Sequence, residues 1–121
     1  MAEQIFEIGV KAEALYFDVF DKTTSRDHYP VRFRRLSDRL QDCALNIYCK
    51  AVDANAARTD TQRGRELAYE LKTDVVSDCN KLLSLTKYSM HRKLISTATG
   101  EEWTRKIHDV KFMTLAWRKS F

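Results

Sequence analysis

The sequence has very little glycine and proline, the two residues that most often interrupt helices. Its 121 residues include only three glycines and one proline. The chain is otherwise rich in Ala, Leu, Arg, Lys and Glu, so we expect nearly all of it to be helical. It also lacks an apolar run of the roughly 18 residues that a membrane span requires. Hydrophobic content of 44% and charged content of 31% predict one ordinary globular domain, residues 1–121.

Cysteine is scarce as well. Cys43, Cys49 and Cys79 are odd in number and far apart, which favours small reduced core residues over a disulfide. The segment Met1–Ala14 lacks the charged and then apolar layout of a signal peptide. We therefore expect a cytoplasmic protein with no membrane association.

Patterns typical of enzymes are missing. The three histidines are scattered, and no Glu-x-x-His pair of the kind that holds di-iron in helical bundles occurs. No Cys-x-x-Cys or close His/Cys spacing supports zinc. Nothing near Cys43 in the sequence is arranged to lower the pKa of its thiol, which favours a core role over a nucleophile. We expect no catalytic residue, no metal and no cofactor.

Four amphipathic segments are visible from the spacing of apolar residues. They run over residues 3–22, over residues 31–55 after Pro30, from an N-cap at Asp60 or Thr61 to His91, and from a cap at Ser96 or Thr99 onward. The apolar stripes are Ile5, Ile8, Ala12, Leu15, Val19; Leu36, Leu40, Cys43, Ala44, Ile47, Ala51, Ala54; Ala68, Leu71, Val75, Cys79, Leu82; and Trp103, Ile107, Val110, Thr114, Trp117. Short links favour antiparallel neighbours, so we predict an all-α, antiparallel up-down-up-down four-helix bundle.

Positive charge is concentrated in two stretches that this topology brings to one end of the bundle. Residues 18–40 carry six basic and four acidic side chains, and residues 78–106 carry six basic and three acidic ones, whereas the whole chain has a net charge of +4. The candidate phosphate-binding residues are Arg32, Arg34, Arg35, Arg39, Lys81, Lys87, Arg92, Lys93, Arg105 and Lys106. Arginine grips phosphate oxygens in a bidentate way, so this end is a candidate surface for binding nucleic acid.

A simpler interpretation stays open, because charged runs on helices are often only solvated faces. Asp38 and Asp42 could pair with arginines of the same helix. Tyr29, Phe33 and Tyr88 lie among the basic residues, where they could stack on bases or could pack at the end of the bundle. Apolar residues outside the four stripes either widen the core or line subunit contacts. They are Tyr16, Phe17, Phe20, Leu45, Val76, Leu83, Phe112 and Leu115.

The order of several motifs resembles a known family. These motifs are the string from Arg35 to Tyr48 with Ala54-Asn55, the string from Cys79 to Leu85, Ile95-Ser96, and the closing string from Ala116 to Ser120. Together they resemble the accessory variability determinant (Avd) proteins of diversity-generating retroelements, and the related bundles encoded in ribosomal-RNA intervening sequences. The likeness spans residues 15–120. Where relatives often have Phe-Pro-Lys before the second helix, this chain has Tyr29-Pro30-Val31.

The resemblance implies a non-enzymatic subunit that forms a ring-like homopentamer. Such a ring binds the element's reverse transcriptase and its template RNA or cDNA, and supports mutagenic copying. Carried over to this chain, the basic surface of the family falls on Arg32, Arg34, Arg35, Arg39, Lys81, Lys87, Arg92 and Lys93, with Arg118 and Lys119 at the opposite end. Two alternatives stay open: a stand-alone bundle associated with ribosomal RNA, and a protein-interaction scaffold that binds no nucleic acid.

Overall fold

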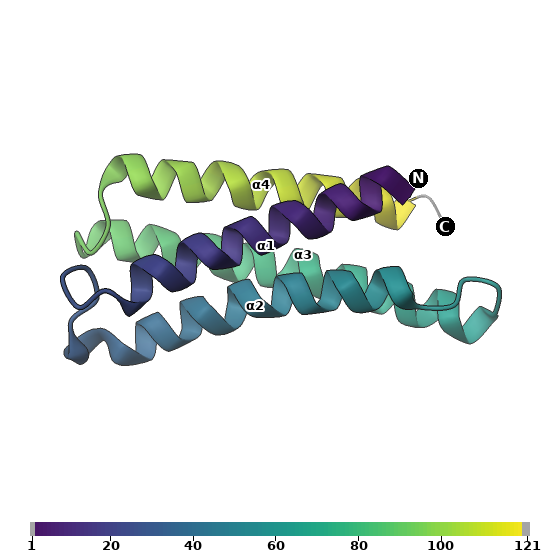
Figure 1. The fold of residues 1–121 in the computed structure, drawn as a ribbon, viewed down its shortest axis with the longest axis horizontal. Coiled ribbons are helices and arrows are strands. Elements are labelled where there is room, and N and C mark those ends of the chain that lie inside the picture. The colour runs from purple at the N-terminus through teal and green to yellow at the C-terminus, as the bar shows by residue number, and fades with distance from the viewer. Residues whose placement is uncertain (1, 120–121) are drawn as a thin grey trace.

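The computed structural model describes residues 2–119, and the side chains of residues 7–119. Within this range α1 (Ala2–Thr24), α2 (Arg34–Ala56), α3 (Gln62–His91) and α4 (Thr97–Lys119) follow one another, with a short 3-10 turn, η1 (Val31–Phe33), before α2. The α1–α2 and α3–α4 links lie together at one end, which we call the two-link end, and the α2–α3 link lies at the other (Figure 1). This confirms the predicted all-α, antiparallel up-down-up-down four-helix bundle.

The side chains of the four predicted apolar stripes pack together and form the core. Helix α1 packs against α2 and α4, and α3 packs against the same two helices from the other side. Each described stripe is buried along most of its length, with only Leu36, Cys43 and Leu71 half-buried at its edge. Ile5, also predicted for the core, lies outside the described side chains. The side chains that are at most 2% exposed include Ile8, Ala12, Leu15, Val19, Leu40, Ile47, Val75, Leu82, Trp103, Ile107 and Val110.

Local hydrogen bonds explain where the helices begin. The Thr61 hydroxyl accepts from the backbone N–H of Gly64 at 3.0 Å, and the Ser96 hydroxyl accepts from the N–H of Thr99 at 3.1 Å. Both are N-caps, which satisfy a free donor of the first helical turn. Of the two caps predicted at each of these helix starts, Thr61 and Ser96 are therefore the ones used.

The predicted start of the second helix is wrong by three residues. The N–H of Phe33 donates to the carbonyl of Pro30 at 2.8 Å, a bond that closes a 3-10 turn rather than an α-helical one. Helix α2 begins only at Arg34. Arg32 therefore lies in η1, outside the helical register of Arg35 and Arg39, and the three do not share one face of a continuous α-helix.

Candidate nucleic-acid interface

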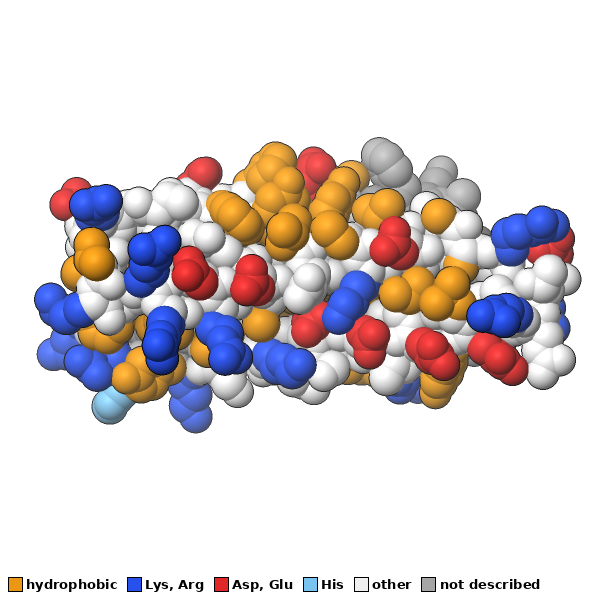
Figure 2. Space-filling view, turned by 90° about the horizontal axis from the view of Figure 1, so that it is seen from below, with side chains coloured by type: hydrophobic (Ala, Val, Ile, Leu, Met, Phe, Trp, Pro, Cys, Tyr) orange, Lys and Arg blue, Asp and Glu red, His pale blue; other side chains and the backbone are white. Residues whose placement is uncertain are grey.

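Eight of the predicted basic residues lie on η1, the first half of α2, the second half of α3 and the start of the α3–α4 link, and all eight are exposed. Figure 2 shows many Lys and Arg side chains toward the two-link end of the molecule, at the left, with fewer at the opposite end and most of the acidic side chains between them. We call this set the basic α2/α3 surface. Its members are Arg32, Arg34, Arg35, Arg39, Lys81, Lys87, Arg92 and Lys93.

Few carboxylates compete for these cations. The segment from residue 79 to residue 100, which forms the second half of α3, the α3–α4 link and the first turn of α4, contains no Asp or Glu. Among the described side chains, neither Asp38 nor Asp42 forms an ion pair with an arginine of α2. Only Lys81 approaches a carboxylate, with Nζ 3.9 Å from Asp78. The α2 arginines therefore keep their hydrogen-bond donors available for phosphate.

Arg105 and Lys106 do not join this surface. Both lie on α4, where Lys106 is bonded to Asp18 of α1 and lies 3.3 Å from Glu102. The hydrogen bond to Asp18 is the main cause that raises the pKa of Lys106. Arg105 lies 3.9 Å from Asp109 on its own helix. At the two-link end the α1/α4 side thus has no excess of positive charge, and the excess belongs to the α2/α3 side.

Arg92 connects the two parts of the basic α2/α3 surface. Its guanidinium carbon lies 5.0 Å from the ring centre of Phe33, which also has the guanidinium of Arg32 at 5.1 Å. Arg92 also donates to the hydroxyl of Tyr88 at 3.1 Å. Cation–π contacts and this hydrogen bond fix the guanidinium between η1 and the end of α3. The sequence placed these residues in one neighbourhood but gave no sign of the contacts.

The three aromatic residues of this end have different environments. Tyr29 is only 4% exposed, and burial raises the pKa of its hydroxyl, so it packs inside the bundle and is not available to stack on bases. Phe33 is half-buried beneath the two guanidinium groups. Tyr88 is 44% exposed. Of the three candidates for base stacking, only Tyr88 presents a large ring surface to solvent.

Lys93 has an unusual backbone conformation. Its φ of 59° lies in the left-handed region, which favours glycine. The backbone N–H of Lys93 donates to the carbonyl of Met90 at 3.0 Å, and the backbone N–H of Leu94 donates to the carbonyl of Ser89 at 2.9 Å. Together these two bonds form a Schellman motif that ends α3, and glycine is the usual residue at this position. A lysine here costs conformational free energy and adds a cation to the basic α2/α3 surface.

A buried lysine beside the C-terminal end of α4 was not foreseen. Lys72 of α3 is 1% exposed, and its Nζ lies 4.3 Å from the ring centre of Trp117. Burial lowers the pKa of Lys72 to about 8. Position 72 lies on the predicted core face, between Ala68 and Val75 of the apolar stripe. Helical periodicity could therefore have predicted the burial of Lys72, if polar residues had also been assigned to the core face.

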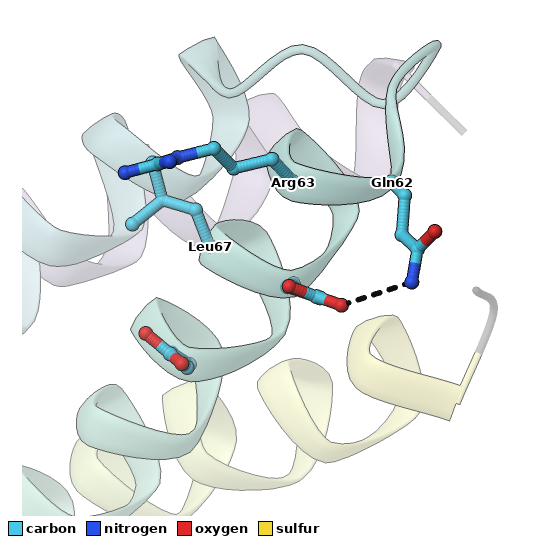
Figure 3. A pocket seen from close by; sticks show the side chains of 5 residues that line it. Gln62, Arg63 and Leu67 are labelled. Atoms are coloured by element: carbon cyan, nitrogen blue, oxygen red, sulfur yellow. Dashed lines mark hydrogen bonds between the residues drawn. The ribbon is translucent and has the colours of Figure 1, made fainter.

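One hollow of the bundle surface is large but poorly suited to an anion. The one in Figure 3, about 590 Å³ in volume, is lined by exposed residues from the first turns of α3, where the amide of Gln62 donates to Glu66 at 3.2 Å. A second hollow, of about 270 Å³, lies between α1 and α2 around Val10, Tyr48 and Val52. The first is open and includes two carboxylates, so it is a poor site for an anion.

Burial also keeps two cysteine thiols protonated at neutral pH. It raises the pKa of Cys43, and it raises the pKa of Cys79 to about 12. A protonated thiol is a weak nucleophile and a poor metal ligand. Among the described side chains, no cluster of three or more His, Cys, Asp or Glu could hold a metal ion.

The chain was compared with known proteins by family, by sequence and by structure. No protein-family model matches it, and neither does a curated protein or a solved structure. In the part of the chain that the structure describes, no helix is both long enough and apolar enough to cross a membrane.

Proposed function

We propose that this chain is a non-enzymatic accessory subunit that binds nucleic acid through the basic α2/α3 surface. Following the resemblance to the Avd family, its partners are the reverse transcriptase of a diversity-generating retroelement and the template RNA or cDNA, in the cytoplasm. The observation that carries the proposal is the gathering of exposed cations from the start of α2 and from residues 79–100, a segment that has no acidic residue. Such a surface neutralises phosphates and releases their counterions.

The arrangement of the surface supports phosphate binding over a merely solvated face. On a solvated face, opposite charges at helical spacing can pair with one another, and such pairs would occupy the guanidinium donors. Here Arg34, Arg35 and Arg39 form no ion pair among the described residues, although Asp38 lies beside them in the sequence. Planar guanidinium groups without carboxylate partners are suited to phosphate oxygens.

Assembly into a homo-oligomer, a pentamer by the same resemblance, is part of the proposal. Half-exposed apolar side chains continue from α1 onto α2, with Phe17 49%, Val52 43% and Leu45 37% exposed. Tyr16 joins them, with its ring centre 4.7 Å from that of Phe17 and 5.3 Å from that of Tyr48. Figure 2 shows a group of hydrophobic side chains near the middle of the molecule. Five copies would raise the net charge to about +20 and strengthen attraction to nucleic acid.

The decisive experiment measures binding as a function of salt. The double variant Arg35→Gln, Arg39→Gln should weaken binding to RNA or DNA and flatten the plot of log affinity against log salt, by about 1 unit for each lost phosphate contact. Both side chains are exposed and unpaired, so the free energy of unfolding should change by less than about 0.5 kcal/mol. The matched control is Arg63→Gln, Arg65→Gln at the start of α3, which removes the same charge at the opposite end. An unchanged slope in the Arg35/Arg39 variant would contradict the proposal.

A second experiment tests the partner. The full chain, immobilised, should retain a reverse transcriptase encoded beside its gene, and deletion of the chain should abolish mutagenic copying. Nucleic-acid binding without any such polymerase would favour a stand-alone bundle associated with ribosomal RNA. Failure to bind nucleic acid at any salt concentration would leave the protein-interaction scaffold.

A further inference from the structure

Five planar groups form a continuous row on the basic α2/α3 surface. The row runs from His91 to Tyr88, then to Arg92, Phe33 and Arg32. The ring centres of His91 and Tyr88 are 6.2 Å apart, and the guanidinium carbon of Arg92 is 6.0 Å from the ring of Tyr88. The next two steps, from Arg92 to Phe33 and from Phe33 to Arg32, measure 5.0 Å and 5.1 Å.

The row combines an exposed outer part with a fixed centre. Tyr88 is 44% exposed, and His91, Arg92 and Arg32 are exposed as well. Phe33 is half-buried and holds two guanidinium groups against its ring. The hydrogen bond from Arg92 to the Tyr88 hydroxyl, 3.1 Å long, restrains the Tyr88 side chain. A restrained ring loses less conformational entropy when a ligand binds on it.

From this row we infer that the basic α2/α3 surface takes single-stranded RNA or DNA, whose unpaired bases stack on Tyr88 and the planar groups beside it. The inference rests on the proposed function and adds the class of nucleic acid. Proteins that bind single strands combine a positive surface along the backbone with aromatic rings on which bases stack. Arg34, Arg35 and Lys87 supply the positive charge here, and the row supplies the planar groups.

Duplex nucleic acid would contact the cations of this surface but would leave its planar groups unused. In a duplex the base faces are already stacked on each other, and unstacking them costs about a few kcal/mol per base step. The cations could still contact the phosphates of a duplex, but the exposed ring of Tyr88 would have no base face to cover it. The row therefore gives a preference for single strands that a basic patch alone would not.

The test compares a 20-nucleotide single strand with a hairpin duplex of equal phosphate number, by fluorescence anisotropy with the full chain. Tyr88→Leu should weaken binding of the single strand about 5-fold or more, since stacking on one ring contributes roughly that much. Tyr88→Phe keeps the ring and should bind within about 2-fold of the wild type. Neither change removes a cation, so the salt dependence should keep its slope. Binding of the hairpin should stay the same in both variants.

The matched control is Tyr69→Leu. Tyr69 also lies on α3, is 51% exposed and has the guanidinium of Arg118 at 5.4 Å from its ring centre. It belongs to the N-terminal part of α3, whereas the basic α2/α3 surface uses the C-terminal half of that helix. This variant should bind the single strand as the wild type does. The inference would be overturned if Tyr88→Leu lost no affinity for the single strand, or if Tyr69→Leu lost as much as Tyr88→Leu. Salt-dependent binding by the wild type would in that case still support the proposed function. A wild-type chain that bound neither probe would refute both.

Discussion

Replacing Lys72 by methionine should stabilise the bundle at neutral pH. Lys72 is 1% exposed, and burial lowers its pKa from 10.5 to about 8. A shift of that size corresponds to about 3 kcal/mol, at roughly 1.4 kcal/mol per pKa unit. This is the approximate desolvation cost of the charged amine on folding at pH 7, which its contact with the Trp117 ring partly offsets. Methionine fills a similar volume and carries no charge, so the Lys72→Met variant should gain up to about that amount.

The pH dependence provides the sharper test. The pKa of Lys72 is lower in the folded chain than in the unfolded chain, so between pH 8 and pH 10.5 the unfolded state binds more protons. Stability due to this group therefore rises with pH through that window. Below pH 8 the amine is charged in both states and the full cost of burial applies. Above pH 10.5 it is neutral in both, and the cost disappears.

Urea denaturation of the wild type and of Lys72→Met at pH 7, 8, 9 and 10.5 measures the difference directly. Other titrating groups are common to both chains and cancel in the comparison. The advantage of the variant should be largest at pH 7 and should shrink steadily toward pH 10.5. Lys87→Met, at an exposed position of the same helix, should change stability by less than about 0.5 kcal/mol at pH 7. A Lys72→Met variant less stable than the wild type at pH 7, or an advantage independent of pH, would refute the reasoning.

Two further changes probe other parts of the structure. Lys93→Gly should raise the free energy of unfolding by up to about 1 kcal/mol in thermal or urea denaturation, because glycine adopts a φ of 59° at no steric cost. The same change should weaken nucleic-acid binding. A variant less stable than the wild type would contradict this account of the α3 end. Light scattering of the wild type should give a multiple of 14.2 kDa, and Phe17→Glu should lower that mass, while Tyr69→Glu, a control of similar exposure, should not. A wild-type mass of one chain would exclude the oligomer.

The fold could be predicted from the sequence because helical periodicity and link length determine it. Val19, Ile47, Leu82 and Ile107 each belong to the apolar stripe of a different helix, and each is fully buried. The caps followed from side-chain type, as at Ser96. The 3-10 turn before α2 did not follow, because the hydrogen bond from Phe33 to Pro30 depends on how the link closes rather than on residue preference.

The candidate site could be predicted only as a list of charges near one end. Lys106 and Asp18 are 88 positions apart, and their pairing depends on which helices are neighbours. The same is true of Arg92 and Phe33, which approach each other only because the end of α3 lies beside η1. Sequence reasoning therefore grouped Arg105 and Lys106 with the other cations, whereas they lie on α4, and Lys106 pairs with Asp18 of α1. The row of planar groups was missed for the same reason.

The antiparallel order of the helices has a consequence for the field at the two-link end. The C-terminal ends of α1 and α3 meet there with the N-terminal ends of α2 and α4. Each helix end carries about half an elementary charge, negative at the C-terminus and positive at the N-terminus, so the four contributions nearly cancel. The potential over this end is therefore set by side chains alone. Since the side chains of the basic α2/α3 surface are exposed, each substitution of a cation there lowers this potential stepwise without disturbing the core that holds the helices together.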